Sequence, residues 1–243
     1  MLYKSTKDMK RNKKALITGG SKGLGFQLAR ALAQTGWDLL VTARNAKELL
    51  QARKQLPGNG EIISIAGDVR DEVYLLELSE TLNTRRWELD LVVNNASTLG
   101  LSPLRNLLDH SVDNLHLVFH TNVIAPISLL QKVKPHLKDD ASIVNISSDA
   151  AVEAYEQWGA YGGSKAGLDH ITAILGKENP DLAVYSFDPG DMRTDMHQAA
   201  FPDQDISDRP LPKEFAVPAL LRLINRNIPS GRYTLDSLKV ELA

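Results

Sequence analysis

The chain has 243 residues, of which 43% are hydrophobic and 24% are charged, which is typical of one large α/β domain rather than two small ones. A net charge of -2 argues against a nucleic-acid partner, because phosphates require a concentrated positive surface. The sequence contains no cysteine, which excludes disulfides and thiolate catalysis, and it has no apolar run of the length that spans a membrane. We therefore expect a cytoplasmic protein that binds a small molecule, with no membrane and no nucleic-acid partner.

Residues 1–12 are predicted to form a flexible basic tail. Six positive side chains lie between Lys4 and Lys14, against the one carboxylate of Asp8. Because termini usually fray, we favour a solvated leader over a tail that binds an anionic partner. Residues 13–243 show no linker or repeat and are predicted to form one Rossmann-type domain that carries both the dinucleotide site and the catalytic site.

Short apolar runs alternate with amphipathic stretches along this domain. The expected strands cover 14–18, 39–42, 62–66, 91–94, 142–147 and 182–187. The expected helices cover 24–35, 46–55, 71–84, 104–135, 160–178 and 214–226. Strand-helix repetition of this kind predicts an α/β fold with a doubly wound, mainly parallel sheet of about seven strands and helices on both faces. Ligands of such sheets bind at the carboxyl ends of the strands.

A glycine-rich segment, residues 18–25, joins the first expected strand to the first expected helix. Gly19 permits the tight turn, Gly23 lets the backbone approach a pyrophosphate, and Gly25 lets the helix pack against the strand. The N-terminus of a helix offers free N–H groups and a positive dipole to phosphates. We predict a dinucleotide site here, to which Ser21, Lys22 and Leu24 also belong.

The cofactor is predicted from the end of the second expected strand, which reads Thr42-Ala43-Arg44. An NAD site usually has an acidic residue here that binds the ribose. The guanidinium of Arg44, helped by Lys22, would instead bind a 2′-phosphate. We therefore favour NADP(H), with the alternative that Arg44 is a solvated residue that opens the next helix.

Three motifs then follow in order: Thr18-Gly19-x-x-x-Gly23-x-Gly25, Asn94-Asn95-Ala96-Ser97 and Tyr161-Gly162-Gly163-Ser164-Lys165. Together they resemble the short-chain dehydrogenase/reductase family over roughly residues 13–195. The resemblance implies that further residues border the adenine (Asp68, Val69), support the cofactor (Asn95, Ala96) and hold the nicotinamide end (Pro189, Gly190, Met192, Thr194). It also implies a homodimer or homotetramer that pairs through the helices at 104–135 and 160–178.

The chain departs from the family pattern at two places. Ser97 stands where the family usually has glycine, and the segment 231–236 lacks the usual aspartate-glycine-glycine near the last strand. The seventh strand therefore lacks its usual sequence signal.

The catalytic group is predicted from Tyr161 and Lys165, four residues apart and hence on one face of a helix. A tyrosine titrates near about 10, so an acid/base tyrosine at neutral pH needs a positive charge beside it, and Lys165 would supply it. Ser148 ends an expected strand and lies 13 residues before Tyr161, which is the family's usual separation. Its hydroxyl would polarise the carbonyl oxygen, with the alternative that it only caps the strand end.

Asn122 is the fourth predicted catalytic residue. Pro126 lies four residues later and has no N–H to donate to the Asn122 carbonyl. The resemblance implies that this carbonyl holds a water that relays protons to Lys165. The same kink could instead serve only to wrap the helix around the core.

These observations predict an NADP(H)-dependent oxidoreductase that reduces a ketone, aldehyde or 3-oxoacyl carbonyl, or runs the reverse reaction. The alternatives are a non-catalytic NADP(H)-binding sensor or scaffold, which the intact catalytic set disfavours, and a sugar-nucleotide epimerase or dehydratase, which the short C-terminal region disfavours. His116 and His120 lie four residues apart, but no HExxH pattern accompanies them, so no metal is expected. The segment 188–212 is predicted to be a loop over the site.

Overall fold

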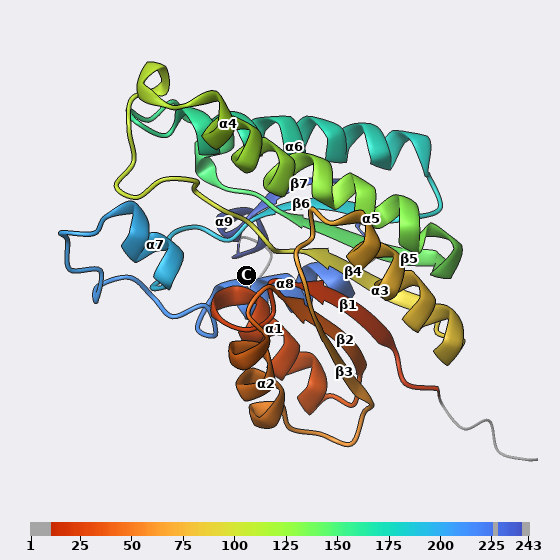
Figure 1. Cartoon of the computed structure of the whole chain (residues 1–243). Coiled ribbons are helices and arrows are strands. Elements are labelled where there is room, and N and C mark those ends of the chain that lie inside the picture. The colour runs from red at the N-terminus through yellow and green to blue at the C-terminus, as the bar shows by residue number, and fades with distance from the viewer. Residues whose placement is uncertain (1–10, 226–227, 240–243) are drawn as a thin grey trace, which may run out of the picture.

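Seven parallel strands form one sheet in the computed structural model, which describes residues 11–225 and 228–239 (Figure 1). The strand order is β3-β2-β1-β4-β5-β6-β7, which confirms the predicted fold class. The strands are β1 (Lys14–Thr18), β2 (Asp38–Ala43), β3 (Ile62–Ala66), β4 (Leu89–Asn94), β5 (Leu137–Ile146), β6 (Ala183–Asp188) and β7 (Gly231–Thr234). The helices are α1 (Gly23–Gln34), α2 (Ala46–Gln55), α3 (Glu72–Arg85), α4 (Val112–Phe119), α5 (Ala125–Val133), α6 (Gly159–Glu178), α7 (Asp195–Ala200), α8 (Ala216–Asn225) and α9 (Leu235–Lys239).

Helices cover both faces of the sheet because neighbouring strand residues point in opposite directions. Ile17 of β1 packs with α1, α2 and α8 in one core, and Leu16 packs with α3 and α5 in the other. Val41 and Leu40 of β2 are divided in the same way. The side chains on both faces of these strands are thus apolar, which explains why the strands read as near-continuous apolar runs.

The predicted helix over 104–135 is wrong as one helix. A loop with a short 3₁₀ turn precedes α4, and the Ser111 hydroxyl caps α4 by accepting a hydrogen bond from Asn114 N at 3.2 Å. Between α4 and α5 the chain forms a π-helical turn, His120–Ile124, in which Ala125 N donates to His120 O. Pro126 follows at once, and its missing N–H favours such a break.

The C-terminal part also differs from the sequence-based expectation. β7 is present beside β6 although the usual aspartate-glycine-glycine pattern is missing. The loop predicted over 188–212 contains the short helix α7, and Figure 1 shows this segment projecting beyond the body of the sheet. The helix expected over 214–226 begins at Ala216, and residue 226 lies outside the described residues.

The order of the strands determines where a ligand site can form. β1 lies between β2 and β4, so the sheet order reverses next to β1, and its carboxyl end faces the glycine-rich segment. Arg44, Asn95 and Pro189 follow the carboxyl ends of β2, β4 and β6. Because the strands are parallel, these chain segments meet along one edge of the sheet.

Candidate active site

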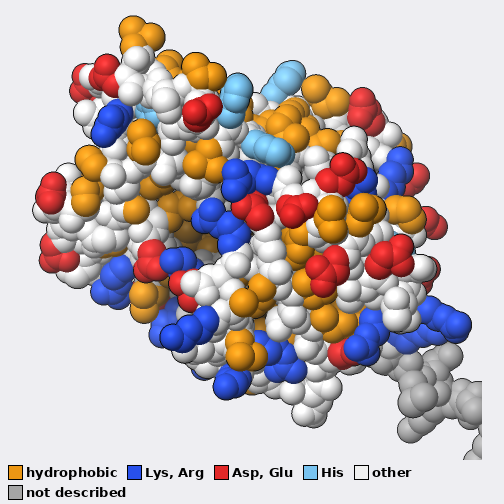
Figure 2. Space-filling model, in the orientation of Figure 1, with side chains coloured by type: hydrophobic (Ala, Val, Ile, Leu, Met, Phe, Trp, Pro, Cys, Tyr) orange, Lys and Arg blue, Asp and Glu red, His pale blue; other side chains and the backbone are white. Residues whose placement is uncertain are grey.

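A pocket of about 680 Å³ opens at the carboxyl ends of the strands, beside the segment that carries α7 (Figure 2). It brings together most of the predicted site residues, from both the cofactor group and the catalytic group. These are Gly19, Ser21, Lys22, Gly23, Leu24, Arg44, Val69, Asn95, Ala96, Ser148, Tyr161, Lys165, Pro189, Gly190, Met192 and Thr194. Three predicted residues, Gly25, Asp68 and Asn122, are not among its lining.

The structure explains several glycines of the glycine-rich segment, including Gly23, whose φ is +57°. Gly19 has a φ of +66°, a conformation that disfavours side chains. A Cβ on Gly25 would lie 2.5 Å from the Asn95 side-chain nitrogen and 2.5 Å from the Gly19 oxygen, so Gly25 permits close packing without lining the pocket. Asn95 holds the turn by donating to Thr18 O at 2.9 Å and to Gly19 O at 3.0 Å.

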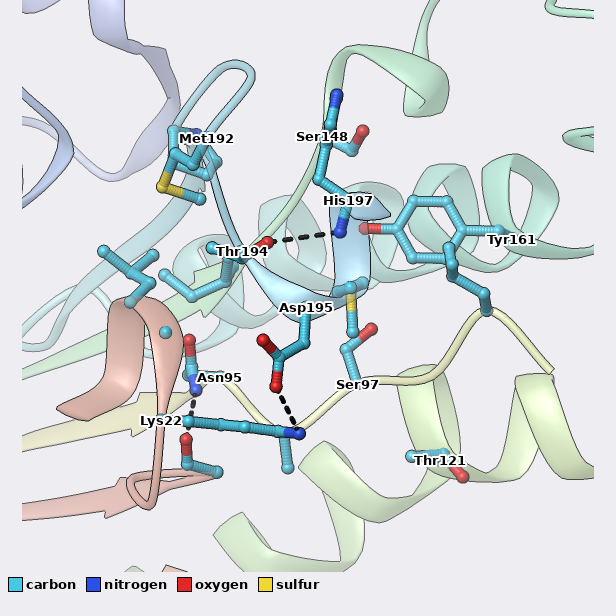
Figure 3. A pocket seen from close by; sticks show the side chains of 18 of the residues that line it. Lys22, Asn95, Ser97, Thr121, Ser148, Tyr161, Met192, Thr194, Asp195 and His197 are labelled. Carbon is cyan, nitrogen blue, oxygen red and sulfur yellow. Dashed lines mark hydrogen bonds and ion pairs between the residues drawn. The ribbon is translucent and has the colours of Figure 1, made fainter. Parts of the chain in front are cut away.

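The N-terminus of α1 faces the pocket without a side-chain cap. Lys22 occupies the cap position and makes no capping hydrogen bond there. Its ammonium instead binds Asp195 at 2.8 Å across the pocket mouth (Figure 3). The first N–H groups of α1 therefore remain as donors toward the pocket.

Only some of the residues predicted to bind the adenine end of the cofactor line the pocket. Arg44 is exposed and lines the pocket directly after β2. Val69 lines it as well, whereas Asp68 is held beside the pocket by Arg70 at 2.6 Å. The hydrogen bond from the Arg70 guanidinium lowers the pKa of Asp68, so this carboxylate stays ionised and paired.

Tyr161 and Lys165 lie one turn apart on α6, and both are buried. The Lys165 ammonium lies 5.6 Å from the centre of the Tyr161 ring and donates to Ile146 O at 2.6 Å. Burial lowers the pKa of Lys165 to about 8, an effect that the nearby Asp169 charge partly offsets. Figure 3 shows the Tyr161 hydroxyl turned into the pocket.

The pKa of Tyr161 is raised in this structure, although the sequence predicted that the Lys165 charge beside it would lower it. Burial raises the pKa of Tyr161, the charges of Asp149 and Asp188 raise it further, and hydrogen bonds with Ser148 and Ser97 lower it only in part. The reason is that burial removes water from the phenolate, while the ammonium is bound to a main-chain carbonyl instead of the phenol.

Ser148 follows β5 and caps a 3₁₀ turn, Asp149–Ala151. Its hydroxyl accepts from Ala150 N at 3.2 Å and donates to Asp149 Oδ1 at 2.8 Å. The neighbouring Ser147 also lines the pocket, and its hydroxyl has no hydrogen-bond partner among the described residues. Ser148 thus has the capping role that the sequence left as an alternative, and its hydroxyl also faces Tyr161.

Asn122 lies in the π-helical turn, outside the pocket lining, and its side chain is almost fully buried. Its Oδ1 accepts from Ser97 Oγ at 3.0 Å and from Thr98 N at 2.9 Å. Its Nδ2 donates to Thr98 O and to Ser164 Oγ, both at 2.9 Å. Asn122 therefore joins the segment after β4 to α6, the helix that carries Tyr161.

Sequence reasoning missed Arg232 of β7. Its guanidinium donates to Asp169 at 2.9 Å, to Asp188 at 3.0 Å and to the Ser148 carbonyl at 3.1 Å. It ties the ends of β5 and β6 to α6, although its partners lie 44 to 84 residues away along the chain. No local motif could have signalled contacts at such separations.

Several unassigned side chains complete the pocket wall. Trp158, Met196 and His197 line it, and Trp158 contacts Phe201 at 5.9 Å between ring centres. The sequence alone assigns these residues no role.

Among residues 11–225 and 228–239, no three His, Asp or Glu side chains are grouped as metal ligands would be, and His116 and His120 are no exception. No described helix has the length and apolar character needed to cross a membrane.

Comparison with known proteins places this site in a family. Residues 13–205 match the short chain dehydrogenase family. The chain is 32% identical to L-xylulose reductase of Caenorhabditis elegans, over 89% of this chain and 90% of that protein. It is 33% identical to the rhamnolipids biosynthesis 3-oxoacyl-(acyl-carrier-protein) reductase of Pseudomonas aeruginosa, over 68% of this chain and 66% of that protein.

A similar solved structure agrees with this assignment. A short chain dehydrogenase of Pseudomonas syringae superposes with a TM-score of 0.86, at 26% identity, over 97% of this chain and 99% of that one. The sequence match, the parallel sheet and the order of the motifs agree with one another. The chain belongs to the short-chain dehydrogenase/reductase family of oxidoreductases.

Proposed function

We propose that this protein is an NADP(H)-dependent oxidoreductase that reduces the carbonyl of a ketone, an aldehyde or a 3-oxoacyl compound to an alcohol, or runs the reverse reaction. The observation that carries the proposal is the shared pocket. Tyr161, Ser148 and Lys165 line the same cavity as the uncapped N-terminus of α1.

The residues present fit a dinucleotide. The turn at Gly19 and the close contact at Gly25 leave the backbone of the glycine-rich segment facing the cavity, and the α1 N–H groups are donors for a pyrophosphate. Asn95, Pro189 and Met192 line the pocket further along, where the nicotinamide end would be held. When bound, the nicotinamide cofactor supplies or accepts the hydride.

The chain's own residues would handle the proton and the developing charge. Tyr161 donates its phenolic proton to the carbonyl oxygen as negative charge builds there, and the Ser148 hydroxyl, on turning from Asp149 Oδ1, donates a second hydrogen bond to that oxygen. The Lys165 ammonium lies 5.6 Å from the Tyr161 ring, where it stabilises the phenolate that remains. The Asn122 main-chain carbonyl, which cannot accept from Pro126, would hold a water that returns a proton to Lys165.

The preference for NADP(H) rests on Arg44. The residue after β2 is a cation exposed at the pocket wall, and a ribose 2′-phosphate carries the complementary charge. Lys22 would join it only after giving up its ion pair with Asp195, which is 2.8 Å long and mostly solvent-exposed. Exposed pairs of this kind are weak, about 0–1 kcal/mol, so the exchange costs little.

We also propose that the protein forms a homodimer or a homotetramer. α4 and α6 contact each other and expose large apolar side chains, Val112, Phe119 and Ile174. A homodimer or homotetramer that buries these residues fits such a surface.

The test is a fluorescence titration with NADPH and with NADH on the wild type, on Arg44→Ala and on the control Arg30→Ala, which removes an exposed arginine of α1. Losing a charged hydrogen bond to the 2′-phosphate should weaken NADPH binding about tenfold to hundredfold in Arg44→Ala, with NADH binding almost unchanged. Equal losses for both nucleotides, or tighter binding of NADH by the wild type, would contradict the NADP(H) preference.

A further inference from the structure

Four aspartates line the pocket, and three of them are paired with cations. Asp188 binds Arg232 at 3.0 Å. Asp191 lies 3.4 Å from Arg209 and 3.8 Å from the His197 ring, and Asp195 binds Lys22 at 2.8 Å. Each of these three carboxylates therefore has a compensating group beside it. Asp149 is the fourth.

Asp149 has hydrogen-bond donors but no ion pair within the described residues. Its Oδ1 accepts from Ser148 Oγ and from Ala150 N, both at 2.8 Å, and its Oδ2 accepts from the Tyr155 hydroxyl at 3.0 Å. These donors are neutral, so they hold the carboxylate in place without cancelling its charge. The side chain is exposed toward the pocket.

The charge of Asp149 acts on the reacting groups. It is the charge that most raises the pKa of Tyr161, ahead of Asp188, so its field reaches the phenolic oxygen that faces the substrate carbonyl. The Lys165 amine, which also lines the pocket, is buried and bound to the Ile146 carbonyl. A negative charge on the substrate beside its carbonyl would therefore meet an uncompensated carboxylate.

Apolar side chains also line this end of the pocket, beside His197, whose ring lies 3.8 Å from Asp191. The apolar side chains are those of Leu99, Trp158, Met196 and Ala200. These side chains can contact a hydrocarbon substituent, and they offer no positive group to a carboxylate or phosphate.

We infer that Asp149 is a specificity-determining residue that restricts this site to carbonyl compounds that are uncharged or cationic near the carbonyl. The inference rests on the proposed carbonyl reduction and names the substrate class for that same site. Discrimination of this kind comes from repulsion of the wrong substrate.

The test compares ethyl 3-oxobutanoate with the 3-oxobutanoate anion as substrates for NADPH oxidation. The ester-to-acid ratio of kcat/KM is measured for the wild type, for Asp149→Asn, for the charge-preserving Asp149→Glu, and for the control Asp181→Asn in the exposed loop after α6. Taking a ratio removes any effect that the Asp149 change has on both substrates through the Ser148 hydroxyl.

The wild type should prefer the ester by at least about tenfold, equivalent to about 1.4 kcal/mol, and Asp149→Asn should lower the ratio by about that factor. Asp149→Glu and Asp181→Asn should keep the wild-type ratio. High salt should reduce the ratio for the wild type, because it screens exposed charges. An unchanged ratio in Asp149→Asn would overturn the inference.

A binding measurement separates this inference from the proposed function. Ethyl 3-hydroxybutanoate and the 3-hydroxybutanoate anion are titrated into the enzyme with NADP⁺ by calorimetry. If neither oxo compound is reduced, but the wild type still binds the ester more tightly and Asp149→Asn binds both equally, the catalytic proposal fails and charge selection by Asp149 holds. Equal binding of both by the wild type would overturn charge selection, whatever the activity.

Discussion

Replacing the buried Lys165 by methionine should stabilise the protein at neutral pH although it abolishes catalysis. The pKa of Lys165 falls from its ordinary value of 10.5 to about 8 on folding, mainly through burial. One pKa unit corresponds to about 1.36 kcal/mol, so the charged amine destabilises the folded state by about 3 kcal/mol at pH 7. Methionine is similar in length and removes that charge.

The gain is reduced by one lost contact. The Lys165 ammonium donates to Ile146 O at 2.6 Å, and a carbonyl that loses its buried donor destabilises the fold by about 1 kcal/mol. The net stabilisation of Lys165→Met at pH 7 is therefore about 2 kcal/mol.

The pH dependence identifies the cause. Between about pH 8 and 10.5 the unfolded wild-type chain keeps the Lys165 proton and the folded protein loses it, so wild-type stability rises with pH. The advantage of Lys165→Met should therefore shrink and be close to zero at pH 10.

Urea unfolding followed by circular dichroism at pH 7 and pH 10 measures this difference for the wild type and Lys165→Met. Lys47→Met makes the same chemical change at an exposed position and should shift the free energy of unfolding by less than about 0.5 kcal/mol at both pH values. The reasoning would be refuted if Lys165→Met were less stable than the wild type at pH 7. It would also be refuted if the stability advantage of Lys165→Met were as large at pH 10 as at pH 7.

Two further substitutions probe the supports of the site. Asn122→Ala removes four side-chain hydrogen bonds, two of them to the Thr98 backbone. It should lower the free energy of unfolding, measured by urea unfolding, by about 2–4 kcal/mol. A loss below about 1 kcal/mol would argue against this role of Asn122. Gly25→Ala places a Cβ 2.5 Å from the Asn95 amide nitrogen. It should weaken NADPH binding, measured by calorimetry, at least about tenfold. Unchanged affinity would show that the glycine-rich turn can shift to accept the methyl group.

Much of the fold could be predicted because it depends on local pattern. A strand buried on both faces needs apolar residues at successive positions, and β1, β2 and β4 show that pattern. The turn at Gly19 and the spacing of Tyr161 and Lys165 are equally local. These features indicated both the sheet and the position of the site.

What could not be predicted depends on tertiary contacts. The break before α4 follows from the cap at Ser111, a weak signal inside a stretch of helical periodicity. Arg232 reaches partners on three other segments. The raised pKa of Tyr161 follows mainly from burial that only the folded chain creates.

The measurement that most directly tests the central claim is NADPH oxidation by the purified protein with a panel of ketones and aldehydes, repeated on Tyr161→Phe. The account predicts turnover by the wild type with at least one uncharged carbonyl compound. Tyr161→Phe removes the proton donor and should lower kcat by at least about a hundredfold while it still binds NADPH. Turnover that survives Tyr161→Phe would contradict the assigned chemistry, and NADPH binding without turnover of any compound would contradict the catalytic role.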